Sequence, residues 1–139
     1  MYYATPEWIS KQIPQWMWSR YEIYIAPYGT TLSNIANVNP KTTALIGFSA
    51  GGIDVLKNYN QQYKLCVLLD PSTRSKYALV EYGSNTLMFY NAANWGTMNK
   101  SLMAVANRIN ETGGNAMSLD LQHADLLKYF FAHFKSDTE

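Results

Sequence analysis

Residues 43–52 read Thr-Ala-Leu-Ile-Gly-Phe-Ser-Ala-Gly-Gly, an apolar run followed by a serine set between glycines. The run Thr43–Ile46 predicts a strand, and the residues from Ile53 to about Tyr59 are compatible with a helix. Between them, the G-x-S-x-G spacing around Ser49 is typical of a nucleophile elbow, a sharp turn from a strand into a helix. Such a turn strains the serine backbone and leaves little room for side chains two residues before and two after it. We therefore expect Ser49 to stand clear of a sheet as a nucleophile.

The composition describes one globular domain, residues 1–139. The chain is 47% hydrophobic, and only 15% of its residues are charged, for a formal net charge of +1. Without a basic run it offers no phosphate-binding surface, so nucleic acid is not an expected partner. No apolar stretch approaches the roughly 20 residues of a membrane-spanning helix, and the N-terminus lacks the features of a signal peptide. The single cysteine, Cys66, lies in an apolar run and predicts a buried, inert thiol. We expect a cytoplasmic protein.

Segments with strand-like composition alternate with helical patterns along the chain. The predicted strands are Met1–Ala4, Tyr21–Ala26, Thr43–Ile46, Lys64–Leu69, Thr86–Tyr90 and Asn115–Leu121. The predicted helices run from Pro6 to about Arg20 with a kink or restart at Pro14, and over Thr31–Val38 (or a turn), Ile53–Tyr59, Met98–Ile109 and Leu126–Phe134. This order predicts an α/β fold: a doubly wound, mostly parallel sheet of about six strands with helices on both faces.

Polar residues follow several of the predicted strands. Ser49, Asp70, Asn91 and His123 all stand after strand ends, with His123 in a predicted loop. Ligands bind at the carboxyl ends of the strands in open parallel sheets. We therefore expect these side chains to share one edge of the sheet.

This arrangement resembles the α/β-hydrolase fold family. The elbow Gly47–Gly52, the position of His123 between the last strand and the last helix, and the segment Tyr24–Pro27 followed by Gly29 carry the resemblance. It implies a truncated, lid-less α/β-hydrolase fold that begins at the family's third strand. It also implies a serine hydrolase of esterase or lipase type that cleaves a carboxylic ester or related acyl bond. Ser49 would be the nucleophile and His123 the base.

The third member of the triad is open. The family usually places its acid after the strand that corresponds to Thr86–Tyr90, but the loop Asn91–Trp95 contains no carboxylate. Asp70, one strand earlier, is the substitute, because some lipases of the family take their acid from that point. The alternative is that Asn94 or Asn91 orients His123. Asp120 and Asp125, which flank His123, are lesser candidates.

For the oxyanion hole, the resemblance implies the backbone N–H of Ala50 as one donor. The second donor would come from Ala4 or Thr5, since Pro6 has no N–H. The other histidine, His133, lies late in the predicted last helix and is expected at a helix end or facing solvent. Two histidines without a nearby cysteine or paired carboxylates give no metal-ligand spacing, so we expect neither a metal nor a cofactor.

Two other function classes compete with hydrolysis. The departures from the family pattern would also suit a catalytically weak or inactive binding module, and an acyltransferase would use the same nucleophile. The expected ligand of the hydrolase is a small-molecule ester or acyl substrate in an open pocket. The strand predicted at Met1–Ala4 would be an unpaired sheet edge, which predicts a homodimer through the N-terminal edge.

Overall fold

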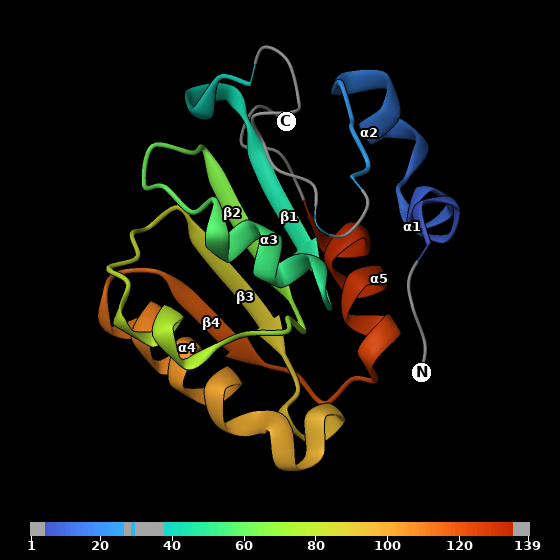
Figure 1. Ribbon diagram of the computed structural model, residues 1–139. Helices are drawn as coiled ribbons and strands as arrows, with labels where there is room; N and C mark the ends of the chain where they lie inside the picture. The colour runs from blue at the N-terminus through green and yellow to red at the C-terminus, as the bar shows by residue number, and fades with distance from the viewer. Residues whose placement is uncertain (1–4, 27–28, 30–37, 135–139) are drawn as a thin grey trace.

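A four-stranded, all-parallel sheet forms the centre of the protein. The computed structural model describes residues 5–26, 29 and 38–134. Within them, the sheet consists of β1 (Ala44–Phe48), β2 (Leu65–Leu69), β3 (Thr86–Tyr90) and β4 (Asn115–Ser118), side by side in the order β1-β2-β3-β4 (Figure 1). The α/β class with a parallel sheet, predicted from the alternating pattern, is confirmed.

The number of strands and their winding differ from the prediction. The described sheet has four strands rather than about six, and its order runs in one direction without the reversal of a doubly wound sheet. The segment Tyr21–Ala26 forms no strand. Its Ile23 packs against the apolar core while Tyr24 stays 63% exposed, so the alternating pattern is satisfied without ladder hydrogen bonds. Met1–Ala4 lies outside the described residues, and the dimer contact proposed there stays a prediction.

The helices follow the predicted order with small shifts of their ends. They are α1 (Pro6–Gln12), α2 (Gln15–Arg20), α3 (Gly51–Lys57), α4 (Asn99–Glu111) and α5 (His123–His133), with 3-10 turns at Pro40–Thr42, Ser75–Leu79 and Ala92–Met98. The predicted restart at Pro14 is confirmed, because this proline precedes the first residue of α2. His123, predicted in a loop, is instead the first residue of α5. Most of the predicted segment Thr31–Val38 lies outside the described residues.

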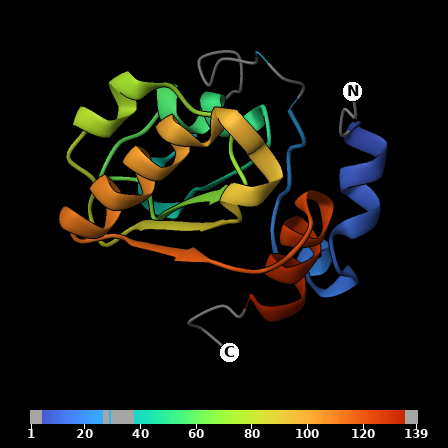
Figure 2. The same cartoon turned by 90° about the horizontal axis from the view of Figure 1, so that it is seen from below.

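Helices cover both faces of the sheet, because alternate residues of each buried strand point to opposite sides. In β2, Cys66 and Leu68 belong to a cluster with α3 and α4, whereas Val67 and Leu69 belong to a second cluster with α5 and Met17 of α2. Figure 2 shows α4 running across one face of the sheet and α5 lying next to α1. Within the described residues, no helix is both long and apolar enough to cross a membrane.

Candidate active site

Ser49 stands in a strained turn between β1 and α3. Its φ is 56°, a left-handed value that residues other than glycine rarely adopt. Hydrogen bonds fix this backbone: the Ser49 N–H donates to the Leu69 carbonyl (3.1 Å), and the Ser49 carbonyl accepts from Gly52 N–H (2.9 Å) and Ser72 N–H (2.8 Å). The surrounding chain therefore holds the serine at the carboxyl end of the sheet in a conformation that it would not choose alone.

The steric demand of the elbow falls on Gly47 and Gly52. A Cβ at Gly47 would lie 2.6 Å from the Gly51 carbonyl oxygen, and one at Gly52 would lie 2.3 Å from the Cβ of Pro71. A Cβ at Gly51 would meet nothing within 4 Å. The expectation that the residue two after the serine must lack a side chain is therefore wrong. The close approach is instead made three residues after the serine, where α3 packs on the chain that follows β2.

Asp70 follows β2 directly and is the other strained residue. Its φ is 43°, and in the described part of the chain Ser49 and Asp70 are the two residues other than glycine with positive φ. Its side chain is fully buried. The carboxylate accepts three hydrogen bonds: from the Asn91 N–H (2.9 Å), from the Asn94 side-chain amide (3.0 Å) and from His123 Nδ1 (2.6 Å). A buried carboxylate needs such donors to offset the loss of water.

His123 is positioned by Asp70 and by two aromatic rings. Phe48 lies 4.8 Å from the imidazole, between ring centroids, and Trp95 meets it edge-on at 5.6 Å. Because an ionised Asp70 can only accept, Nδ1 carries the proton, and Nε2 of a neutral ring is left as a proton acceptor. The His123 side chain is 30% exposed.

The Ser49 hydroxyl is not joined to this pair by a hydrogen bond within the described residues. The connection is through neighbours: Phe48, the residue before Ser49, contacts the His123 ring, and β1 and β2 pair Phe48 with Leu69, the residue before Asp70. Such serine–histidine bonds are often long or unformed without a bound substrate. The structure therefore brings Asp70 and His123 into contact and sets Ser49 at the same edge of the sheet.

Asn91 and Asn94 donate hydrogen bonds to Asp70 and not to His123. Besides their bonds to Asp70, the side-chain amides of Asn91 and Asn94 both donate to the Leu121 carbonyl, each at 3.0 Å. Neither bonds to the His123 ring in the described chain. The bonds to Leu121 connect the loop after β3 to the segment just before His123. No contact among the described residues supports the alternative in which Asn91 or Asn94 orients the imidazole.

Of the two proposed oxyanion donors, the backbone N–H of Ala50 belongs to the residue after Ser49. It donates no hydrogen bond to another described residue. Thr5 is the N-cap of α1, where its hydroxyl accepts from the Trp8 N–H (3.1 Å). No contact links Thr5 to Ser49 in the described chain, and Ala4 lies outside it.

The other residues considered from the sequence, His133, Cys66 and Asp125, form no hydrogen bond with Ser49, Asp70 or the His123 ring in the described chain. His133 lies at the exposed end of α5, where Nδ1 is 2.9 Å from the Tyr129 carbonyl oxygen and the ring stacks on Tyr129. Cys66 is buried, and burial raises the pKa of its thiol to about 11. Asp125 lies in the first turn of α5. No group of three or more histidine, cysteine, aspartate or glutamate side chains in the described residues is arranged to hold a metal ion.

Sequence reasoning missed the two rings that contact His123, Phe48 and Trp95. Trp95 also has a buried indole N–H with no acceptor in the described part of the chain, which leaves a spare donor near the site. The only signal for Trp95 was its place in the loop after β3, which the family resemblance put near His123. Nothing in the sequence indicated that Trp95 itself contacts the imidazole ring.

Comparisons with known proteins add no assignment. No family model matches the chain, and no curated protein or solved structure matches it either. The residues of the candidate site and their geometry are therefore the basis on which a function can be inferred.

Proposed function

We propose that the protein is a serine hydrolase of the α/β-hydrolase type that cleaves a carboxylic ester or a related acyl bond. One observation carries the proposal. A fully buried carboxylate, Asp70, holds His123 through Nδ1 at the sheet edge where a strained elbow presents Ser49. Strained backbones collect at functional sites, and an acid that fixes one imidazole nitrogen leaves the other free to act as a base.

The order of the parts also supports the proposal. Nucleophile, acid and histidine follow one another along the chain as Ser49, Asp70 and His123, the order found in α/β-hydrolases. The four strands with α3, α4 and α5 correspond to the part of that fold that begins at the elbow strand. The likeness is one of arrangement, since no family model matches.

In the proposed reaction, the Ser49 oxygen attacks the carbonyl carbon of the ester while His123 Nε2 takes the hydroxyl proton. Asp70 stabilises the imidazolium, and the Ala50 N–H donates to the oxyanion of the tetrahedral intermediate. His123 then returns the proton to the departing alcohol, which leaves an acyl group on Ser49. A water molecule, deprotonated by His123, attacks this acyl-enzyme, releases the carboxylic acid and restores the serine.

A fluorophosphonate probe tests the proposal directly, because it bonds covalently to an activated serine with loss of fluoride. We expect the protein to be labelled and Ser49→Ala to abolish the labelling. Ser84→Ala is the matched control, since Ser84 lies before β3 at the opposite edge of the sheet and should leave labelling intact.

Two outcomes count against the proposal. Equal labelling of the Ser49→Ala variant would mean that another residue reacts. A folded protein that takes up no probe at all would favour the inactive binding module.

A further inference from the structure

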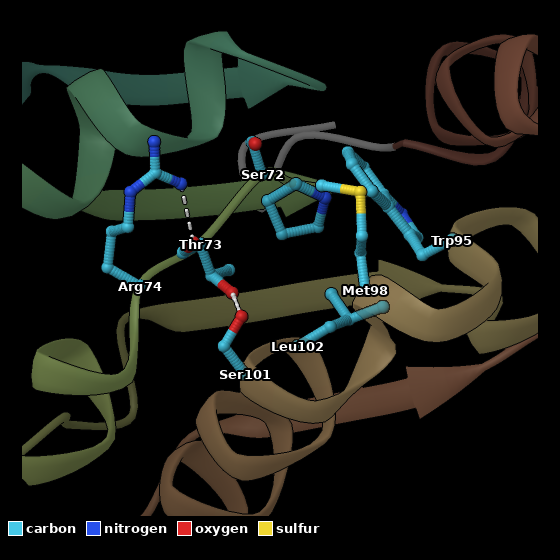
Figure 3. A pocket seen from close by; sticks show the side chains of 8 residues that line it. Ser72, Thr73, Arg74, Trp95, Met98, Ser101 and Leu102 are labelled. Carbon is cyan, nitrogen blue, oxygen red and sulfur yellow. Dashed lines mark hydrogen bonds between the residues drawn. The ribbon is translucent and has the colours of Figure 1, made fainter.

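A basic hollow adjoins the candidate site. Two adjoining depressions of about 40 Å³ and about 480 Å³ share the residues Thr73, Arg74, Met98 and Ser101. The larger one is widely open to solvent, and its volume is within the range of small-molecule pockets, roughly 300–1,000 Å³. Figure 3 shows Arg74 on one side of the smaller depression, Trp95 and Met98 on the other, and the Thr73–Ser101 pair below. We call this region the Arg74–Lys100 hollow.

The hollow is connected to the reacting groups at two points. Trp95 lines it and also meets the His123 ring edge-on at 5.6 Å. Pro71 and Ser72 line it as well; they directly follow Asp70, and the Ser72 N–H donates to the Ser49 carbonyl. A substrate with its carbonyl carbon at Ser49 would therefore meet the hollow with a part remote from that carbon.

The charges lining the hollow have one sign. Arg74 and Lys100 contribute two cations, and no aspartate or glutamate is among the described residues that line either depression. Arg74 Nη1 donates to the Thr73 carbonyl (2.8 Å), which anchors the guanidinium and leaves its other N–H groups available. The Lys100 ammonium group forms no hydrogen bond or ion pair with a described residue. The hydroxyls of Ser75 and Thr97 add neutral donors, and in the Thr73–Ser101 pair one hydroxyl donates to the other, which leaves one further donor.

We propose that the Arg74–Lys100 hollow binds an anionic oxygen group, a carboxylate or a phosphate, carried by the substrate away from its scissile bond. The guanidinium fork of Arg74 matches either group in two parallel hydrogen bonds, and Lys100 adds a mobile second charge. The substrate class is then an acidic ester, not a neutral lipid ester. This reading of the hollow rests on the proposed hydrolase function.

The kinetic test compares two p-nitrophenyl esters of equal length, the half-ester of adipic acid and the hexanoate. We expect a higher kcat/KM for the acidic ester, and a charged-to-neutral ratio that falls about 10-fold in Arg74→Gln/Lys100→Gln, since charge-assisted hydrogen bonds are the stronger kind. Lys41→Gln/Lys76→Gln controls for the loss of two positive charges, because neither lysine lines either depression. The wild-type preference should shrink at about 1 M salt, where the Debye length is only about 3 Å.

A binding test separates the hollow from the catalysis. Calorimetry with the Ser49→Ala protein uses adipate in one arm and inorganic phosphate in the other, which distinguishes the two kinds of anion. Binding that is lost in the Arg74→Gln/Lys100→Gln background supports the anion site even if no ester is hydrolysed. Hydrolysis of both esters at a ratio near one, with neither anion bound, would overturn the inference and leave the hydrolase proposal standing.

Discussion

Asp70 is the residue on which the candidate site depends most. Its buried carboxylate is held by a backbone N–H, an amide and an imidazole, so all three donors are arranged for an acceptor with negative charge. An asparagine has nearly the same shape but brings an NH₂ group into this set. If that NH₂ group faces the Asn91 N–H or the Asn94 amide, two donors oppose each other. If it instead faces His123, it donates to Nδ1, and the imidazole proton moves to Nε2.

We therefore predict that Asp70→Asn lowers turnover by about 10³-fold or more while the domain stays folded, because the proton on His123 moves to Nε2. Ester hydrolysis and circular dichroism measure the two parts of this prediction. Asp125→Asn is the matched control, since Asp125 lies in the first turn of the helix that His123 begins and has no bond to the imidazole ring in the described chain. Equal activity in the two variants would remove Asp70 from the reaction.

Much of this residue-scale arrangement could be predicted from the sequence. Asp70 and His123 follow strands of a parallel sheet, so topology alone places both at one edge, but it does not choose Asp70 over Asn91 or Asn94 as the partner of His123. The roles of Asn91 and Asn94 could not be predicted, because they depend on where the loop after β3 turns back. The same loop brings Trp95 to His123, a contact between residues 28 positions apart, for which no local pattern exists.

In the turn from β1 into α3, the neighbouring glycines Gly51 and Gly52 differ in how much space surrounds them. At Gly52 the close neighbour is Pro71, so an added methyl group would force the chain after β2 away from α3. At Gly51 there is open space, and the residue is the first of the helix.

Alanine substitutions at the two positions should therefore have opposite effects on the free energy of unfolding. We expect Gly52→Ala to lower it by about 1–3 kcal/mol through overpacking. We expect Gly51→Ala to raise it by about 0.4–1 kcal/mol, because the unfolded chain loses freedom and the helix accepts alanine. Urea denaturation of both variants measures the difference. A loss of stability in Gly51→Ala equal to that of Gly52→Ala would contradict the assignment.

At the same scale, strand-like composition was a sound guide for the four segments that form the sheet and a poor one for Tyr21–Ala26. The predicted strand Thr86–Tyr90 is β3 without change, because it is buried between two neighbours. The segment Tyr21–Ala26 has an equally good pattern, yet it buries Ile23 against the core and forms no ladder. Alternating apolar and polar side chains indicate that one face of a segment is buried. They do not indicate that the segment pairs with a strand, because pairing also requires backbone hydrogen bonds to a neighbouring strand.

Across the whole molecule, the two faces of the sheet are covered unequally. The face with α3 and α4 is covered by helices rich in buried residues, including Val105, Ala106 and Ile109 of α4. On the other face, α5 is well buried, but α1 has no buried residue and α2 has only Met17. Segments with few buried apolar contacts open at lower free energies than the rest of a protein.

We predict that α1 and α2 unfold before the sheet. Three of the four tryptophans, Trp8, Trp16 and Trp18, lie in these helices, so the Trp95→Phe variant confines tryptophan fluorescence to them. Its fluorescence midpoint in urea should precede the far-ultraviolet circular dichroism midpoint by about 0.5 M or more. Coincident curves would show instead that the two helices and the sheet form one cooperative unit.

The strained backbone at Ser49 has a consequence for how this protein responds to selection. A φ of 56° is unstrained for glycine and strained for almost every other residue. At position 49, stability of the fold therefore favours glycine, whereas the proposed reaction requires serine. Variants chosen for heat resistance alone would gain from glycine there and lose the serine. Under the proposed function, a serine at position 49 persists in a lineage only while its chemistry is useful.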